Sequence, residues 1–448
     1  MRHSIRARPV AVALLLSVVW VAGCTGSPAA TTRGTATPSD VVSDCLLAPV
    51  SCYAPHLFQA EYGIPPLLDR GIDGRGETVT VLAPAPSRGT PSPSSPTLSG
   101  GATPLAGTAP AVTDIRQDLA AFDSMFRLAA ARIQVVTTLA GAGSPWQAAG
   151  EEIQDAEIVH AVAPAATLRV VLLPANVADS AATATAGLLA GLRLAVSGTD
   201  VAVISLSLGE HYFSRAQVAQ MHSILVGAEA HHVTVIAGSG DNGGFSDADF
   251  GGTPVKEVSL PASDPLVLAV GGTTLTGNLL AGLYVSETAW NGQSGFVLSS
   301  GASGGGFSHL YARPAYQDGV HGISTMRGVP DVAGDADEKG GWAVVLTSGG
   351  QRSVIPAFGT SASASLWGGL LALADQYADH DLGFVNPAIY RIARGSGYHQ
   401  AFHDITTGSN VVNAPPVGTG GYQAGPGWNP VTGWGTPDAQ VLVPLLAA

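Results

Sequence analysis

Apolar residues along this chain follow two alternating patterns, short uninterrupted runs and longer stretches with helical spacing. The short runs are rich in Val, Ile and Leu and predict buried strands at 78–83, 168–173, 201–206, 233–237 and 266–270. The longer stretches predict helices at 114–128, 150–162, 181–196 and 215–230. Strands that are apolar on both faces and alternate with helices form a parallel sheet covered on both sides. The pattern therefore predicts an α/β fold.

The N-terminal residues depart from this pattern. Residues 1–23 hold three arginines and then an apolar stretch shorter than a typical membrane span, ending before Cys24. This resembles a bacterial lipoprotein signal peptide, with Cys24 as the lipidated, membrane-anchoring residue of an exported protein. Plain secretion and an uncleaved anchor are the alternatives.

The amino-acid composition separates the rest of the chain into a tether, a folded domain and an insertion within that domain. Residues 24–51 are rich in Ser, Thr, Ala and Pro and predict a flexible tether, so we expect one large folded domain at 52–448. Residues 84–112 have a similar composition and predict a long low-complexity insertion on the surface. An exported chain lies in an oxidising compartment, which favours a disulfide between Cys45 and Cys52.

The net charge of the chain bears on which classes of molecule it could bind. The formal net charge is −13, and no basic run occurs outside the N-terminus. This composition argues against nucleic-acid binding.

A hydroxyl lies where a tight turn leads into a buried helix. Ser361, within Phe358-Gly359-Thr360-Ser361-Ala362-Ser363, directly precedes the apolar run 366–373. Backbone N–H groups at a helix start are unpaired, and small neighbours leave room for a substrate. Ser361 is therefore a candidate nucleophile, and an ordinary helix cap is the alternative.

Three carboxyl groups could serve such a nucleophile. Glu151 and Asp155 are four residues apart on a predicted helix, so they share one face. They form either a functional dyad or a pair of acids favoured by the helix dipole. Asp241 follows a predicted strand within a glycine-rich loop, where an Asx-turn is the alternative to a role in chemistry.

Taken together, these motifs resemble the sedolisin (serine-carboxyl peptidase) family from about Cys52 to the C-terminus. Glu151, Asp155, Asp241 and Ser361 occur in the order and local contexts of that family. Further similar segments are 71–76, 260–265 with 271–273, 287–291, 303–306 and 327–334. The resemblance implies a subtilisin-like parallel sheet in a single catalytic domain.

The resemblance also implies a mechanism for hydrolysing peptide bonds in peptide or protein substrates. Ser361 would attack the carbonyl carbon, Glu151 would act as general base and Asp155 would orient Glu151. Asp241, when protonated, would donate a hydrogen bond to the oxyanion. Because Asp241 must hold a proton, we expect a serine-carboxyl endopeptidase that works at acidic pH.

Residues 402–437 resemble the calcium loops of the same family. The implied ligands of one Ca2+ are Asp404, Ile405, Gly425, Gly427 and the residue at 429. The family usually has Asp where this chain has Asn429, so we expect weaker binding. A Gly/Pro loop without metal is the alternative.

Other departures leave alternatives open. Only residues 25–51 precede the domain, where the family usually carries a large propeptide, and we expect folding and latency to be handled differently. Leu208 replaces a Trp near the family's substrate cleft, and Ser365 replaces a Pro after the nucleophile. A subtilisin-type enzyme would need a His base, and His160 within a helix is a poor candidate. A catalytically silent lipoprotein that binds peptides or a surface partner is the remaining alternative.

Overall fold

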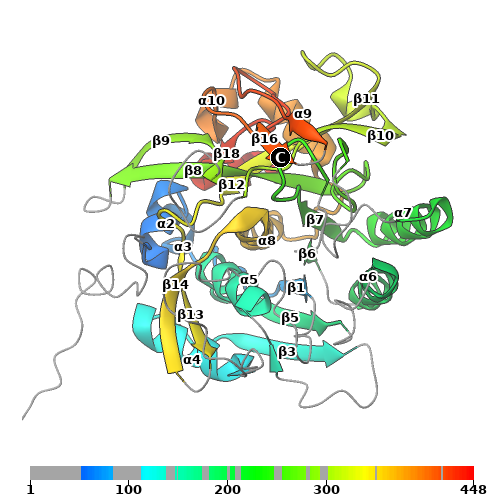
Figure 1. Ribbon diagram of the computed structural model, residues 1–448. Helices are drawn as coiled ribbons and strands as arrows, with labels where there is room; N and C mark the ends of the chain where they lie inside the picture. The colour runs from blue at the N-terminus through cyan, green and yellow to red at the C-terminus, as the bar shows by residue number, and fades with distance from the viewer. Residues whose placement is uncertain are drawn as a thin grey trace, which may run out of the picture. The chain divides into compact units, whose positions relative to one another are not determined.

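A sheet of eight strands forms the centre of the computed structural model (Figure 1). The structure describes residues 52–83, 113–137, 147–148, 150–173, 181–198, 202–206, 213–246, 255–278, 283–292, 301–348, 351–414 and 417–448. Seven strands lie in the order β12-β8-β7-β6-β1-β5-β3, each parallel to its neighbours, and β9 pairs antiparallel with β8. Their bounds are β1 Thr78–Ala83, β3 Arg132–Thr137, β5 Thr167–Leu172, β6 Val203–Leu206, β7 Thr234–Gly238, β8 Leu268–Asn278, β9 Leu283–Ala289 and β12 Val332–Asp335.

Helices pack on both faces of this sheet (Figure 1). Because side chains alternate along a strand, β6 contributes Val203 to one apolar core and Ile204 to the other. The core that contains Val203 also contains residues of α4, α5, α8 and α11, and the core that contains Ile204 contains residues of α6 and α7. Their bounds are α4 Ile115–Phe126, α5 Gly150–Val162, α6 Ala181–Val196, α7 Arg215–Ala230, α8 Gly359–Ala378 and α11 Ala439–Leu446.

Shorter elements surround this framework. The short helices are α2 Pro55–Glu61, α3 Pro65–Leu68, η4 Ala315–Gln317, α9 Asn386–Ala393 and α10 Tyr398–Ala401. The remaining strands form two-stranded sheets. These are β2 Thr113–Asp114 with β4 Gln147–Ala148, β10 Gly306–Ala312 with β11 Met326–Val329, β13 Ala343–Ser348 with β14 Gln351–Pro356, β15 Phe402–His403 with β18 Thr436–Pro437, and β16 Val412–Ala414 with β17 Gly418–Gly420.

The predicted α/β architecture is confirmed. The helices predicted at 150–162, 181–196 and 215–230 have the observed bounds. Helix α4 begins one residue later than predicted because Asp114 is its N-cap, with a side chain that accepts a hydrogen bond from the Arg116 N–H at 3.1 Å.

The predicted strands are present with small shifts, and β8 is longer because it continues into a hairpin with β9. The apolar runs did not predict β3, β9 and β12 of the main sheet. Strand β3 lies at the sheet edge, where Arg132 and Gln134 are both exposed, so it lacks a continuous apolar run. Strand β12 contains only four residues, and three of them are small or acidic.

Helices α5 and α8 run in the same direction and lie very close together. A Cβ atom added to Gly369 would lie 2.5 Å from the Cβ of Val162, so only glycine allows this approach. Helix α8 is buried from Gly359 to Asp375 except at Ser361. This packing holds the first turns of the two helices side by side, where Glu151 and Ser361 lie.

Several predictions fall on residues outside the described ranges. They are the signal peptide at 1–23, the tether at 24–51, the insertion at 84–112 and the substituted position Leu208. Cys52 is disulfide-bonded, and its predicted partner Cys45 also lies outside these ranges. In the part of the chain that is described, no helix combines the length and apolarity needed to span a bilayer.

Candidate active site

The turn that carries Ser361 depends on a glycine. Phe358 is the extended N-cap of α8, and Gly359 follows with φ +85°, a conformation that side chains disfavour. A Cβ atom on Gly359 would also lie 2.7 Å from Asp241 Oδ2. The glycine therefore brings the backbone of the helix start directly against the Asp241 carboxyl group.

Ser361 is hydrogen-bonded to the predicted base. Its Oγ donates to Glu151 Oε1 at 2.7 Å, although the two residues are 210 positions apart in sequence. Both side chains are partly buried. Ser361 is the third residue of α8 and not its N-cap, so the structure argues against an ordinary capping role. The pair has the geometry of a nucleophile and its general base.

Asp155 lies one turn further along α5 than Glu151, and its side chain is fully buried. Positions four apart in a helix share a face, so Asp155 lies on the same side of α5 as Glu151, the side that packs toward α8. A buried carboxyl group at this position can restrict the orientation of Glu151 and influence its charge.

Asp241 follows β7 and contacts the turn from the other side. Its Oδ1 accepts hydrogen bonds from the backbone N–H and the hydroxyl of Thr360, each at 2.9 Å. Burial raises the pKa of Asp241, and the two bonds from Thr360 oppose that rise in part. The carboxyl group is therefore protonated more readily than a free aspartate.

Two residues of this site were not predicted from the sequence. The Thr360 hydroxyl donates to Asp241 and also accepts from the Gly240 N–H at 3.1 Å. Gln154 lies between Glu151 and Asp155 in α5, and its amide both accepts from the Phe358 N–H and donates to the Phe358 carbonyl, each at 3.2 Å. The adjacency of Thr360 to Ser361 was a usable signal, whereas nothing in the sequence pairs Gln154 with residue 358.

His160 has a structural environment. It is fully buried in α5, and its Nε2 lies 2.9 Å from the Ala129 carbonyl oxygen and 3.0 Å from Asp123 Oδ1. These contacts agree with the expectation that His160 is a poor candidate for a subtilisin-type base.

The five residues expected to bind calcium do come together, but their contacts do not fit the ion. Nδ2 of Asn429 donates to the carbonyl oxygens of Ile405 and Gly425 at 3.2 and 3.1 Å. The Gly427 N–H donates to both carboxylate oxygens of Asp404. Calcium is bound by oxygen atoms, and here an amide nitrogen points at two of the expected ligands.

Comparisons with known proteins identify a matching family and several relatives. Residues 135–389 match the model of the subtilase family (Peptidase_S8). Kumamolisin of Bacillus sp. (strain MN-32) is 36% identical over 66% of this chain and 50% of its own length. Sedolisin of Pseudomonas sp. (strain 101) is 32% identical over 74% of this chain and 55% of its own. The chain therefore spans about half the length of the curated relatives it matches.

A solved structure extends the similarity to the fold. Pseudomonas sedolisin, described as a serine-carboxyl proteinase complexed with two molecules of pseudo-iodotyrostatin, superimposes with a TM-score of 0.67 at 26% identity. The match covers 89% of this chain and 98% of that chain.

Proposed function

The chain belongs to the subtilase family and, within it, to the sedolisin-type peptidases, and from this premise we propose that it is a serine-carboxyl peptidase that hydrolyses peptide bonds at acidic pH. The observation that carries the proposal is the 2.7 Å hydrogen bond from Ser361 Oγ to Glu151 Oε1. A serine hydroxyl becomes a useful nucleophile only when a base can accept its proton.

The reaction begins with attack of Ser361 Oγ on the carbonyl carbon while its proton passes to Glu151. The carbonyl π electrons move to the oxygen, and the resulting oxyanion requires a hydrogen-bond donor. Glu151 then returns the proton to the leaving amine as the C–N bond breaks. Water hydrolyses the acyl-enzyme in the same way, with Glu151 again as base.

Asp241 supplies that donor when it is protonated. Its Oδ1 already accepts two hydrogen bonds from Thr360, so the proton belongs on Oδ2, the oxygen beside Gly359. A neutral carboxylic acid can donate to an oxyanion where a carboxylate cannot. This requirement sets an upper pH limit on activity, whereas the ionised Glu151 base sets a lower one.

Cleavage of internally quenched peptides by the purified protein tests the proposal. We expect activity between about pH 3 and 6, where carboxyl groups with raised pKa values titrate. Ser361→Ala is expected to lower kcat by about 10⁶-fold, as loss of a serine nucleophile does elsewhere. A peptide aldehyde should label the native chain at Ser361 and leave the variant unlabelled. Labelling without cleavage would indicate a silent peptide-binding protein, and equal activity of the variant would contradict the proposal.

We also propose that the chain is exported and anchored through a lipid on Cys24. The support is the sequence pattern of residues 1–23, which ends directly before that cysteine. Metabolic labelling with a radioactive fatty acid should mark the native chain and not Cys24→Ala, which should appear in the medium. Equal labelling of both chains would contradict the anchor.

A further inference from the structure

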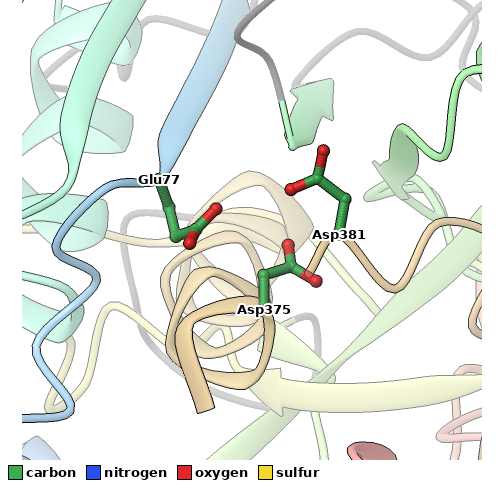
Figure 2. Close-up of side chains that lie close together, drawn as sticks. All are labelled: Glu77, Asp375 and Asp381. Carbon is green, nitrogen blue, oxygen red and sulfur yellow. The ribbon is translucent and has the colours of Figure 1, made fainter. Parts of the chain in front are cut away.

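Three carboxyl groups converge at the end of α8 that is remote from Ser361 (Figure 2). Asp375 lies in the last turn of α8, Asp381 in the loop that follows, and Glu77 directly before β1. One oxygen atom from each of the three lies within 4.8 Å of the other two. Oxygens bound to one ion at 2.3–2.6 Å lie at most about 5 Å apart, so this spacing fits a shared cation.

Asp375 gives independent evidence for a missing partner. Its side chain is fully buried, and its Oδ1 accepts a hydrogen bond from the Leu382 N–H at 2.8 Å. Its Oδ2 is buried and has no hydrogen-bond partner among the described residues. The carboxyl group faces Glu77 and Asp381 (Figure 2). A buried carboxylate oxygen without a partner is costly, because it has lost its water and gained nothing in return.

No positively charged side chain among the described residues neutralises these three carboxyl groups. Among the described residues, no Arg, Lys or His side chain forms an ion pair with any of the three carboxyl groups, and nearby Arg75 pairs with Asp73. The C-terminal end of a helix adds further negative potential. Burial and the neighbouring acids raise the pKa of Asp375 to about 8 and that of Glu77 to about 7.

The geometry points to a cation site formed by Glu77, Asp375 and Asp381, which binds Ca2+ and joins the end of α8 to the start of β1. Three carboxylates can offer six oxygen atoms, and calcium accepts six to eight such ligands in irregular geometry. Water completes the shell on the side of Asp381, which is exposed. Mg2+ binds less well, because it demands near-octahedral geometry and gives up its water reluctantly.

Calorimetric titration of the chelator-treated full chain with CaCl2 tests this site. The chain is expected to bind one Ca2+ and to gain several degrees in Tm when calcium is added. Asp375→Asn should weaken binding at least tenfold and abolish the rise in Tm. Asp379→Asn is the matched control, because it removes the same charge from the same helix end, and asparagine suits the left-handed conformation of that residue.

If the native chain binds no Ca2+, the proposed site is wrong. It is also wrong if Asp375→Asn binds Ca2+ as tightly as the native chain does. Failure of Asp375→Asn to fold is checked by its Tm in chelator, which should not fall below that of the native chain. The titration needs no activity, so it stands whether or not the proposed peptidase function does.

A different observation concerns the C-terminal loops. The orientation of the Asn429 amide is fixed by its neighbours, because its Oδ1 accepts from the N–H groups of Val431 and Thr432 at 3.1 and 3.0 Å. Its Nδ2 must then point at the carbonyl oxygens of Ile405 and Gly425. The side chain is only 4% exposed.

We infer that the Asn429 amide group takes the place of a cation and closes these loops without metal. Both N–H bonds of the amide satisfy carbonyl oxygens that would otherwise need a positive partner. An aspartate at 429 would instead face those oxygens with a negative charge, and only a cation or a proton could bridge them.

Asn429→Asp, made in the Asp375→Asn background, tests this inference. The Asp375→Asn chain should bind no Ca2+, and the double variant should bind one and unfold at lower temperature in chelator. In the native chain, Asp404→Asn should leave the calcium stoichiometry unchanged. A calcium ion lost on Asp404→Asn, or a double variant that binds none, overturns the inference.

Discussion

The two ends of α8 both gather carboxyl groups, yet in opposite electrostatic settings. At its start, Glu151 accepts a hydrogen bond from Ser361, and Asp241 accepts two from Thr360. The N–H groups and the positive dipole end of the helix favour negative charge there. At its other end, the dipole is negative and Asp375 Oδ2 has no partner among the described residues.

The difference shows that clusters of acidic residues can have different roles in the same protein. Where the chain supplies donors, the acids can share protons and exchange them with a substrate, which suits catalysis. Where the chain supplies no cation, the same residue type requires a proton or a cation from solution. The surrounding donors, and not the acids themselves, decide between the two roles.

After Ser361→Ala, the largest effect is expected from Glu151→Gln. This variant keeps the shape of the side chain and can still accept a hydrogen bond from Ser361, but it cannot take the proton. We expect kcat to fall by about 10²–10⁴-fold, the usual contribution of a general base. Steady-state kinetics at the acidic optimum measures the loss, and an unchanged Tm shows that the fold is intact. A loss smaller than tenfold would remove Glu151 from the role of base.

The next effect concerns Asp241 and pH. Burial raises its pKa in the folded chain, so its proton is present at low pH and is lost as the pH rises through that raised value. Activity should decline over the same range. Asp241→Ala should lower kcat by about 10²–10³-fold, as loss of an oxyanion donor does.

Asp241→Asn keeps a donor that does not titrate. Its kcat should fall less than that of Asp241→Ala, and the decline of kcat/KM at high pH should move upward or vanish. An alkaline limit that is the same in Asp241→Asn and the native chain would show that another group sets it.

A smaller effect is expected from Gln154→Leu. Two hydrogen bonds that hold Phe358 are lost, each worth about 1 kcal/mol. We expect kcat to fall by about tenfold, which corresponds to about 1.4 kcal/mol, with little change in KM. Gln376→Leu is a matched control, because Gln376 also binds backbone groups, those of Gly71, Asp73 and Gly74. It should lower Tm and spare kcat. Equal losses of kcat in both variants would deny Gln154 a positioning role.

The smallest effect on catalysis is expected from Asp375→Asn. Roughly 20 Å of helix separate it from Ser361 at 1.5 Å per residue. Sites so far apart act independently, so kcat in chelator should stay within about twofold of the native value. A large loss of kcat would show that the two ends of α8 are coupled.

Much of the fold could be predicted from sequence, because buried parallel strands such as 78–83 are apolar at almost every position. The edge strand β3 could not, since its exposed positions carry Arg132 and Gln134. The four principal site residues could be predicted because each lies in a motif that resembles a known family.

Contacts without a local motif could not be predicted. Gln154 meets Phe358 only because α5 and α8 pack closely at Gly369. Glu77 reaches Asp375 only because the start of β1 lies beside the end of α8. At position 429 the sequence indicated weaker calcium binding, but the direction of the amide became visible only in three dimensions.

The burial of α8 from Gly359 to Asp375 has a consequence for how the protein loses activity. Ser361 lies on a helix that is buried along most of its length, and not on a surface loop that could open by itself. Backbone amides along this helix should therefore exchange with deuterium only when the whole domain unfolds. Inactivation by heat and global melting should coincide, without an earlier stage in which the fold persists and the nucleophile is displaced.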